Sequence, residues 1–216
     1  PAPLTVDAAR LRADLAAASY TVDAVLARIG DLGQEGLGRN CTVPADVALG
    51  DARDPLATLI RLFLLQQSVL TADVTGVLDA AALLAAEYLA EDRGRLFALV
   101  DVRPYGSPDD GASGWLVADP TPGLDHIVDP TEPEYVLGAS PASTTLAQIA
   151  MRAPVGSALD LGTGCGVQSL HLARHAARIV GTDVNPRALE LAALTAALNG
   201  ADVDLHVPAL IPDDYL

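Results

Sequence analysis

The chain has 216 residues and a formal net charge of −15, with 28 acidic residues against 13 basic ones. Half of its residues are hydrophobic, which excludes the disordered class and can supply one large core or two small ones. So acidic a chain repels a polyanion, which disfavours naked nucleic acid as a partner unless the few arginines cluster.

Membrane insertion and extracellular disulfides are also disfavoured. No apolar run reaches the roughly 18 residues that cross a bilayer, because Arg61, Glu87 and Glu91 interrupt the best candidates. Cys41 and Cys165 lie far apart in the sequence and do not form a disulfide framework. We therefore expect a cytoplasmic protein without a membrane-spanning segment.

The first residues have the periodicity of short helices. We expect helices over 6–18 and 21–29, the second of them opened by Thr21 as N-cap. Residues 30–54 are rich in Gly, Asp and Pro, and they predict a connection rather than a helix.

Asp54-Pro55 is typical of an N-cap followed by the first residue of a helix, here one that runs to Leu65. Two further helices are expected near 72–77 and over 80–90, with Thr71 and Asp79 as their N-caps. Two strands follow over 96–102 and 114–118, separated by turn residues 105–111.

Helix, short helix, helix and hairpin is the order of a winged helix, but the residues argue against DNA binding. A recognition helix needs Arg, Lys, Asn or Gln to reach bases and phosphates. Residues 79–89 carry two acids and no base, and only Arg93, Arg95 and Arg103 on the wing could contact phosphate. We expect this region to pack or to present a substrate.

Residues 119–137 are rich in Pro, Gly and acids and predict a joint between two domains, over 1–134 and 135–216. The second domain has an α/β pattern, which implies a parallel, doubly wound sheet. Its expected strands cover 158–161, 179–183 and 203–207, and its expected helices cover 142–152, 167–177 and 185–199.

A glycine-rich loop, Asp160-Leu-Gly-Thr-Gly-Cys-Gly166, follows the first of these strands. Such a loop lets a ligand approach the backbone at the carboxyl end of the sheet. Its glycines give the spacing G-x-G-x-G, whereas the third glycine of a dinucleotide loop would stand at position 167, which is Val. The spacing therefore disfavours a dinucleotide.

Two carboxylates at strand ends indicate the kind of ligand. Asp160 precedes the loop, where it would oppose a pyrophosphate but suits the positive sulfonium and ammonium of S-adenosylmethionine. Asp183 ends the second strand and could accept hydrogen bonds from both ribose hydroxyls. NAD proteins also have an acid at the position of Asp183, so only Asp160 distinguishes an S-adenosylmethionine site from an NAD site.

The motifs at 158–167, 181–189 and 197–200 resemble the small-domain class I methyltransferases, which include glutamine-amide and rRNA guanine N-methyltransferases. The chain also resembles actinobacterial methyltransferases with an extra helical N-terminal region and a Val-Leu-Gly segment like the one at 136–148. The resemblance implies a Rossmann-like sheet with S-adenosylmethionine as cofactor. Val136-Leu-Gly138 and Ser143-Thr-Thr145 would flank the mouth of the site, and the implied cofactor-binding residues are Asp160, Gly162, Thr163, Gly164, Gly166, Asp183, Val184 and Asn185.

The chain departs from this family in one motif. The family has Asn-Pro-Pro-aromatic after the fourth strand, where it orients the acceptor nitrogen, and orientation supplies most of the catalysis. The sequence has no such motif, because Asn185-Pro186 predicts a helix cap. Only the first three strands of the sheet are expected, so we expect the sequence to be incomplete, and the catalytic residues stay unassigned.

Three functions therefore remain open. The favoured one is methyl transfer to a nitrogen of a protein glutamine or an RNA base, although the acceptor class (protein, RNA or small molecule) is not fixed. The second is a non-catalytic module that binds the cofactor. The third is an NAD-binding oxidoreductase, which Asp160 and Val167 disfavour.

Several other residues have simpler interpretations than a site. His171 and His175 have a spacing able to bind zinc, but a solvated helix face is the favoured interpretation and no metal is expected. Cys165 is interpreted as a packing residue and Trp115 as a core residue. The paired acids Asp109-Asp110 and Asp213-Asp214 are interpreted as solvated turns.

Overall fold

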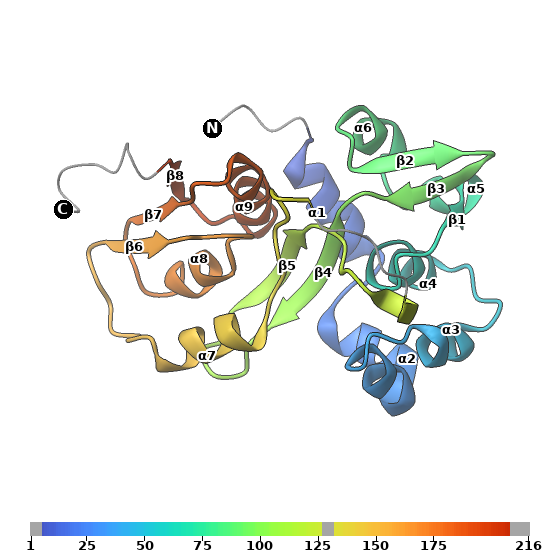
Figure 1. The fold of residues 1–216 in the computed structure, drawn as a ribbon, viewed down its shortest axis with the longest axis horizontal. Coiled ribbons are helices and arrows are strands. Elements are labelled where there is room, and N and C mark those ends of the chain that lie inside the picture. The colour runs from blue at the N-terminus through green and yellow to red at the C-terminus, as the bar shows by residue number, and fades with distance from the viewer. Residues whose placement is uncertain (1–5, 127–131, 208–216) are drawn as a thin grey trace. The chain divides into compact units, whose positions relative to one another are not determined.

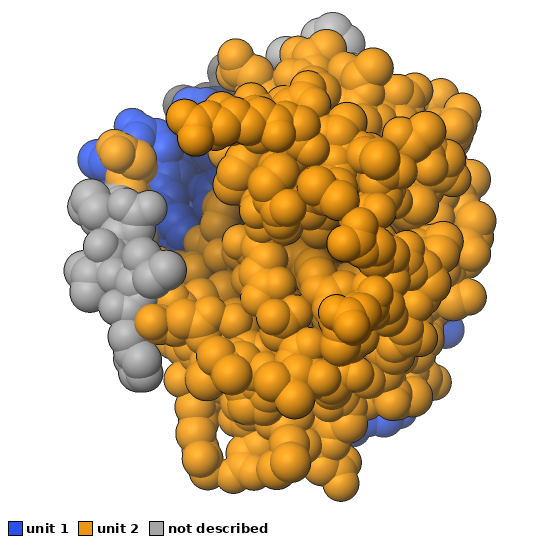
Figure 2. All heavy atoms as spheres, turned by 90° about the vertical axis from the view of Figure 1, so that its right-hand side faces the viewer, with its two compact units in different colours: residues 1–4, 105–119, 133–216 blue, residues 5–104, 120–132 orange. Residues whose placement is uncertain are grey.

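The computed structural model describes residues 6–126 and 132–207, which belong to two compact units (Figures 1 and 2). The helical unit comprises residues 5–104 and 120–132. The glycine-loop unit comprises residues 1–4, 105–119 and 133–216. Within the described residues, no helix is both long and apolar enough to cross a membrane.

The helical unit begins with three helices: α1 (Ala8–Ala17), α2 (Val22–Leu37) and α3 (Val43–Leu49). Their starts follow the expected capping chemistry. Thr21 caps α2 as predicted, since its hydroxyl accepts a hydrogen bond from Ala24 N at 3.3 Å.

The predicted connection over 30–54 is wrong, because most of it is helical. Gly30 has φ +66° and a non-helical backbone, so α2 consists of two helical stretches that meet at a kink there. Gly33 and Gly36 let α3 pack closely: an added Cβ would lie 3.2 Å from Ala45 Cα at the first and 2.9 Å from Pro44 Cγ at the second. These glycines serve helix packing rather than a loop.

The next helix is divided into an α part and a π part. Asp54 caps α4 (Pro55–Leu59), and its carboxylate accepts from Ala57 N at 3.2 Å, as predicted. The chain continues as the π-helix η1 (Ile60–Leu64), in which Leu65 N donates to Ile60 O at 2.9 Å. A helix to residue 65 was expected, but its π geometry was not.

Two short helices and an antiparallel sheet complete this part of the unit. Asp79 caps α6 as predicted, whereas Thr71 lies inside α5 and its hydroxyl donates to Glu91. The sheet order is β1-β3-β2. The bounds are β1 (Val69–Leu70), α5 (Thr71–Val74), α6 (Ala80–Ala85), β2 (Leu89–Asp92), β3 (Arg95–Ala98) and a short 3₁₀ turn, η2 (Leu124–His126).

The predicted helix over 80–90 and strand over 96–102 both have wrong bounds. The helix ends at Ala85, because Glu87 has φ +58° and turns the chain into β2. The turn at Arg93-Gly94 then joins β2 to β3. Leu96 on β3 pairs with Val69 and Glu91, so this strand is not the partner of 114–118.

A buried carboxylate in the helical unit makes its stability depend on pH. Asp101 is 5% exposed and accepts from Arg103 Nη2 at 2.6 Å. Burial raises the pKa of Asp101 to about 6, although the charge and hydrogen bond of Arg103 oppose the rise. The pKa of Asp101 is higher in the folded chain than in the unfolded chain. Its contribution to the free energy of unfolding is therefore fully present below pH 3.8 and is lost as the pH rises through 6.

We therefore expect the free energy of unfolding of the unsubstituted chain to fall by about 2 kcal/mol relative to an Asp101→Asn chain between pH 4 and pH 7. Urea unfolding of both chains followed by circular dichroism at each pH measures this difference. A difference that does not change with pH would contradict the assignment.

The glycine-loop unit contains a parallel sheet of order β6-β7-β8, which confirms the parallel α/β expectation. Asn185 and Gly200 cap the two ends of α9 as predicted. The bounds are α7 (Pro141–Ile149), β6 (Ala158–Leu161), α8 (Val167–Leu172), β7 (Ile179–Thr182), α9 (Pro186–Asn199) and β8 (Asp204–His206). Helix α8 is shorter than expected because Ala177 N donates to Val155 O instead of continuing the helix.

A two-stranded sheet joins β4 (Asp101–Gly106) and β5 (Ser113–Ala118). Within the glycine-loop unit β5 packs on α9: Val117 N donates to Thr195 Oγ1 at 3.0 Å, and Trp115 N donates to Asn199 Oδ1 at 2.9 Å. Trp115 is half-buried, so it lies at the margin of the core.

Candidate functional site

The loop between β6 and α8 has an unusual backbone conformation that depends on its glycines. Gly162, Gly164 and Gly166 have φ values of +70°, +54° and +82°, which L side chains rarely adopt. No atom lies within 4 Å of a Cβ added at the first two, so their backbone is open to a ligand. A Cβ at Gly166 would lie 3.3 Å from Ala192 Cα, so this glycine lets α8 approach α9.

Asp160 holds the loop from within the structure. It is 8% exposed, and its Oδ2 accepts from Thr163 Oγ1 at 2.8 Å and from Ser169 Oγ at 3.4 Å. Burial raises the pKa of Asp160, these hydrogen bonds oppose the rise, and the charge of Asp183 adds to it. Two carboxylates therefore make this end of the sheet negative, which favours a cationic ligand.

Asp183 joins the end of β7 to the loop. Its Oδ2 accepts from Gly164 N at 3.0 Å and its Oδ1 accepts from Asn185 N at 2.9 Å. Each carboxylate oxygen can accept more than one hydrogen bond, so both retain capacity for a ligand hydroxyl. The next residue, Val184, is 80% exposed and presents an apolar surface beside the carboxylate.

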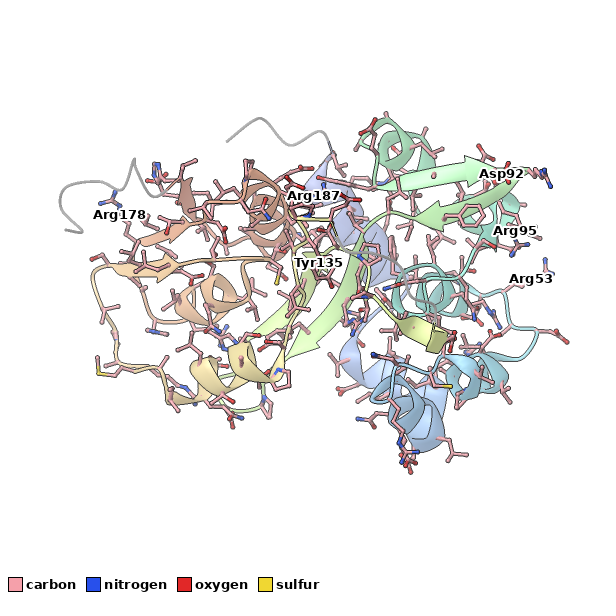
Figure 3. The ribbon with its side chains drawn as sticks, in the orientation of Figure 1. Arg53, Asp92, Arg95, Tyr135, Arg178 and Arg187 are labelled. Atoms are coloured by element: carbon pink, nitrogen blue, oxygen red, sulfur yellow. The ribbon has the colours of Figure 1, made fainter. Side chains whose placement is uncertain are left out.

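Asn185 has a structural role in addition to its predicted one. Its Oδ1 accepts from Arg187 N at 2.9 Å and caps α9, while its Nδ2 donates to Glu134 O at 2.7 Å. Arg187, labelled in Figure 3, also donates to Asp119 Oδ1 at 3.1 Å. The predicted site residues from Asp160 to Asn185 thus meet at the carboxyl ends of β6 and β7.

The segment predicted to flank the site is anchored to α8 and to the end of β5. Ser140 and Ser143 form a capping box at the start of α7. Gln168 Nε2 donates to Ser143 O at 2.7 Å, which joins α7 to the helix that follows the loop. Val136 is buried, and its N donates to Asp119 Oδ2 at 2.8 Å.

The interpretation of His171 and Asp110 as solvated residues is wrong. The side chains of His171 and Asp110 are only 6% and 8% exposed, and His171 Nδ1 lies 2.7 Å from Asp110 Oδ2. His171 Nε2 lies 2.7 Å from the Tyr105 hydroxyl. Sequence reasoning missed this group because its members are distant along the chain and only the fold brings them together.

The remaining predicted residues add no reactive group. Cys165 is buried, in agreement with a packing role. The described residues contain no group of three or more His, Cys, Asp or Glu side chains able to hold a metal ion. Asp213-Asp214 lies outside the described residues.

Two family models each match one part of the chain. Residues 139–212 match the family model "Methyltransferase small domain". Residues 17–99 match "Domain of unknown function (DUF7059)". The glycine loop and both carboxylates lie in the methyltransferase match.

Curated relatives agree with the first of these matches. Over 107 residues the chain is 34% identical to ribosomal protein L11 methyltransferase of Geobacter sulfurreducens and 32% identical to that of Geobacter metallireducens. Each alignment covers 47% of this chain and 35% of the relative. The chain therefore spans about a third of the length of the curated relatives it matches.

A solved structure of ribosomal protein L11 methylase from Lactobacillus delbrueckii subsp. bulgaricus is 28% identical. The match covers 42% of this chain and 49% of that chain, with a TM-score of 0.31, which carries no argument about the fold. The sequence matches support a class I S-adenosylmethionine-dependent methyltransferase.

Proposed function

We propose that the chain is part of an enzyme that transfers a methyl group from S-adenosylmethionine to a nitrogen atom. The observation that carries the proposal is the open G-x-G-x-G loop, held between two carboxylates within the segment that matches a methyltransferase family. Bound S-adenosylmethionine would supply an activated methyl group on its sulfonium. The protein would then contribute mainly orientation of the two reactants.

The proposed cofactor contacts follow from the geometry of the loop. The open backbone at Gly162 and Gly164 suits close approach of the methionine part, and Thr163, Asp160 and Gly166 fix the loop around it. Asp183 would accept hydrogen bonds from the ribose hydroxyls, beside the apolar surface of Val184 and the cap residue Asn185.

Calorimetry with the whole chain tests the nature of the ligand. We expect S-adenosylhomocysteine to bind and NADH not to bind, because Asp160 opposes a pyrophosphate and the loop lacks the third dinucleotide glycine. The reverse result would overturn the proposal. Cofactor binding without methyl transfer to any acceptor would instead favour a non-catalytic module.

We propose that the acceptor nitrogen belongs to a protein side chain, such as a glutamine amide, rather than to an RNA base. The relatives are named for a ribosomal protein, and a net charge of −15 opposes a polyanion. Labelled methyl groups transferred into cell extract should be released by protease digestion. Release by ribonuclease would assign the acceptor to RNA.

The helical unit is proposed to contain a winged-helix-like region. The support is the succession α4 and η1, β1, α5, α6, β2 and β3 with sheet order β1-β3-β2. We do not propose DNA binding for it, because α6 (Ala80–Ala85) has no basic residue. The domain boundary between residues 134 and 135 stays a prediction.

We also propose a cytoplasmic location, which the two free cysteines, Cys41 and Cys165, support.

A further inference from the structure

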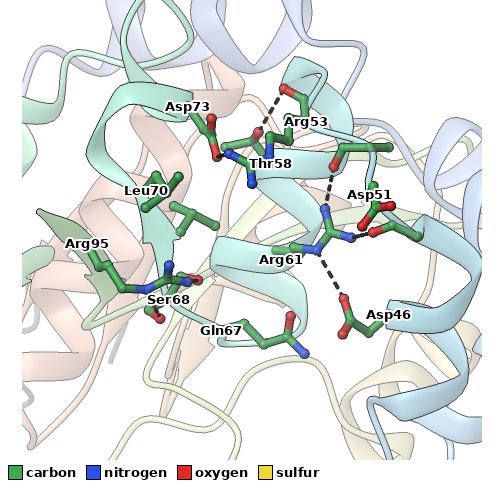
Figure 4. A pocket seen from close by; sticks show the side chains of 13 residues that line it. Asp46, Asp51, Arg53, Thr58, Arg61, Gln67, Ser68, Leu70, Asp73 and Arg95 are labelled. Atoms are coloured by element: carbon green, nitrogen blue, oxygen red, sulfur yellow. Dashed lines mark hydrogen bonds and ion pairs between the residues drawn. The ribbon is translucent and has the colours of Figure 1, made fainter.

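The helical unit contains a polar pocket of about 290 Å³, and the arginine at its centre is bound by the protein itself (Figure 4). Arg61 Nε donates to Asp46 Oδ1 at 3.0 Å, and the other two nitrogens of its guanidinium donate to the carbonyls of Gly50 and Ala52. These hydrogen bonds join η1 to α3 and to the segment after it, so the pocket has a sufficient structural explanation.

In the glycine-loop unit, residues 134–137 form a strap beside the strand end that carries Asp183. Asn185 Nδ2 donates to Glu134 O at 2.7 Å. Because Asn185 follows Asp183 by two residues, the Cα atoms of the two lie within about 7.6 Å of each other. The strap therefore lies close to the carboxylate that is proposed to hold the ribose.

A second set of hydrogen bonds fixes the strap at Val136. Val136 N donates to Asp119 Oδ2 at 2.8 Å, and Val136 O accepts from Asp119 N at 3.1 Å. Arg187, at the start of α9, donates in turn to Asp119 Oδ1 at 3.1 Å. Tyr135, labelled with Arg187 in Figure 3, thus lies between two residues of the strap that are both tied to the start of α9.

The strap and the strand end both expose apolar side chains. Val136 is buried, whereas Leu137 is 57% exposed and Tyr135 is half-buried. Val184, between Asp183 and Asn185, is also exposed. Apolar side chains that gather around a polar anchor are typical of small-molecule sites.

We infer that Tyr135 contacts the adenine ring of S-adenosylmethionine, an assignment that rests on the proposed function. The base of a nucleoside is joined directly to its ribose, so a ribose held at Asp183 brings the base close to Val184 and the strap. Adenine has two flat faces, and an aromatic side chain offers a surface on which such a face can stack. Tyr135 is the aromatic residue of the strap.

The test is a calorimetric titration of the full chain and its variants with S-adenosylhomocysteine. Tyr135→Ala should weaken binding about tenfold or more, because a stacked aromatic side chain contributes about that factor to the binding of a base. Tyr135→Phe keeps the ring and should bind within about twofold of the unsubstituted chain. The matched control is Met151→Ala, which removes an exposed apolar side chain of the same unit and should leave the affinity unchanged.

Nuclear Overhauser effects distinguish a direct contact from support of the strap. In the complex with S-adenosylhomocysteine, the ring protons of Tyr135 should show effects to H2 or H8 of the adenine. Absence of these effects, or unchanged affinity in Tyr135→Ala, would overturn the inference and leave the proposed function intact. Failure of the unsubstituted chain to bind S-adenosylhomocysteine would overturn both.

Discussion

An Asp183→Ala chain is expected to bind S-adenosylhomocysteine about 100-fold more weakly than the unsubstituted chain, as measured by calorimetry. The substitution removes both proposed acceptors of the ribose hydroxyls. It also removes the acceptor that holds Gly164 N at 3.0 Å, so the loop loses a support at the same time. Both losses act in the same direction, which makes this the largest effect we expect on cofactor binding.

Two further variants separate ligand contact from general charge. Asp202→Ala removes an exposed carboxylate of the same unit and should leave the affinity unchanged. Asp183→Asn keeps one oxygen acceptor and should bind with intermediate affinity. If Asp183→Ala bound the ligand as tightly as the unsubstituted chain, the proposal that Asp183 binds the ribose hydroxyls would be wrong.

The elements that the sequence predicted well are those determined by neighbouring residues. Asn185-Pro186 and Gly200 defined α9, and the run before the glycine loop defined β6, because caps and short apolar runs act over a few residues. The loop itself was predictable for the same reason. Its glycines are needed by its own backbone dihedral angles.

Glycine was less informative where its role depended on another helix. Gly33 and Gly36 predicted a connection, but the structure uses them where α3 packs against α2. Nothing local to 30–37 specifies that contact. In a similar way Glu87, at φ +58°, ends a helix whose sequence would have allowed it to continue.

The same distinction between neighbouring and distant residues applies to the candidate site. Asp160 reaches Thr163 and Ser169 on its own loop and helix, so a role in this region could be predicted from spacing. The group of Asp110, His171 and Tyr105 joins residues 61 and 66 positions apart. Only the fold of the unit brings them together, so the sequence could predict each residue only by itself.

That group gives the largest expected effect on stability. A His171→Leu chain should lose roughly 3 kcal/mol of unfolding free energy, because Asp110 would be left as a buried carboxylate without its principal partner. Burial acts to raise the pKa of Asp110, but the hydrogen bond from His171, with others from Ala112 and Ser107, lowers it to about 2. Urea unfolding at pH 7 measures the loss.

The pH dependence distinguishes the loss of this hydrogen bond from simple loss of packing. The pKa of Asp110 in the folded chain lies below the unfolded value of 3.8. Its contribution to the free energy of unfolding is therefore present above pH 3.8 and is lost as the pH falls through 2. The cost of His171→Leu should therefore shrink by roughly 2 kcal/mol between pH 5 and pH 2. His175→Leu, a substitution four residues along the chain, should cost less than about 1 kcal/mol and show no such change. A cost of His171→Leu that stayed constant with pH would mean that the histidine stabilises this unit by its volume and not by its hydrogen bond to Asp110.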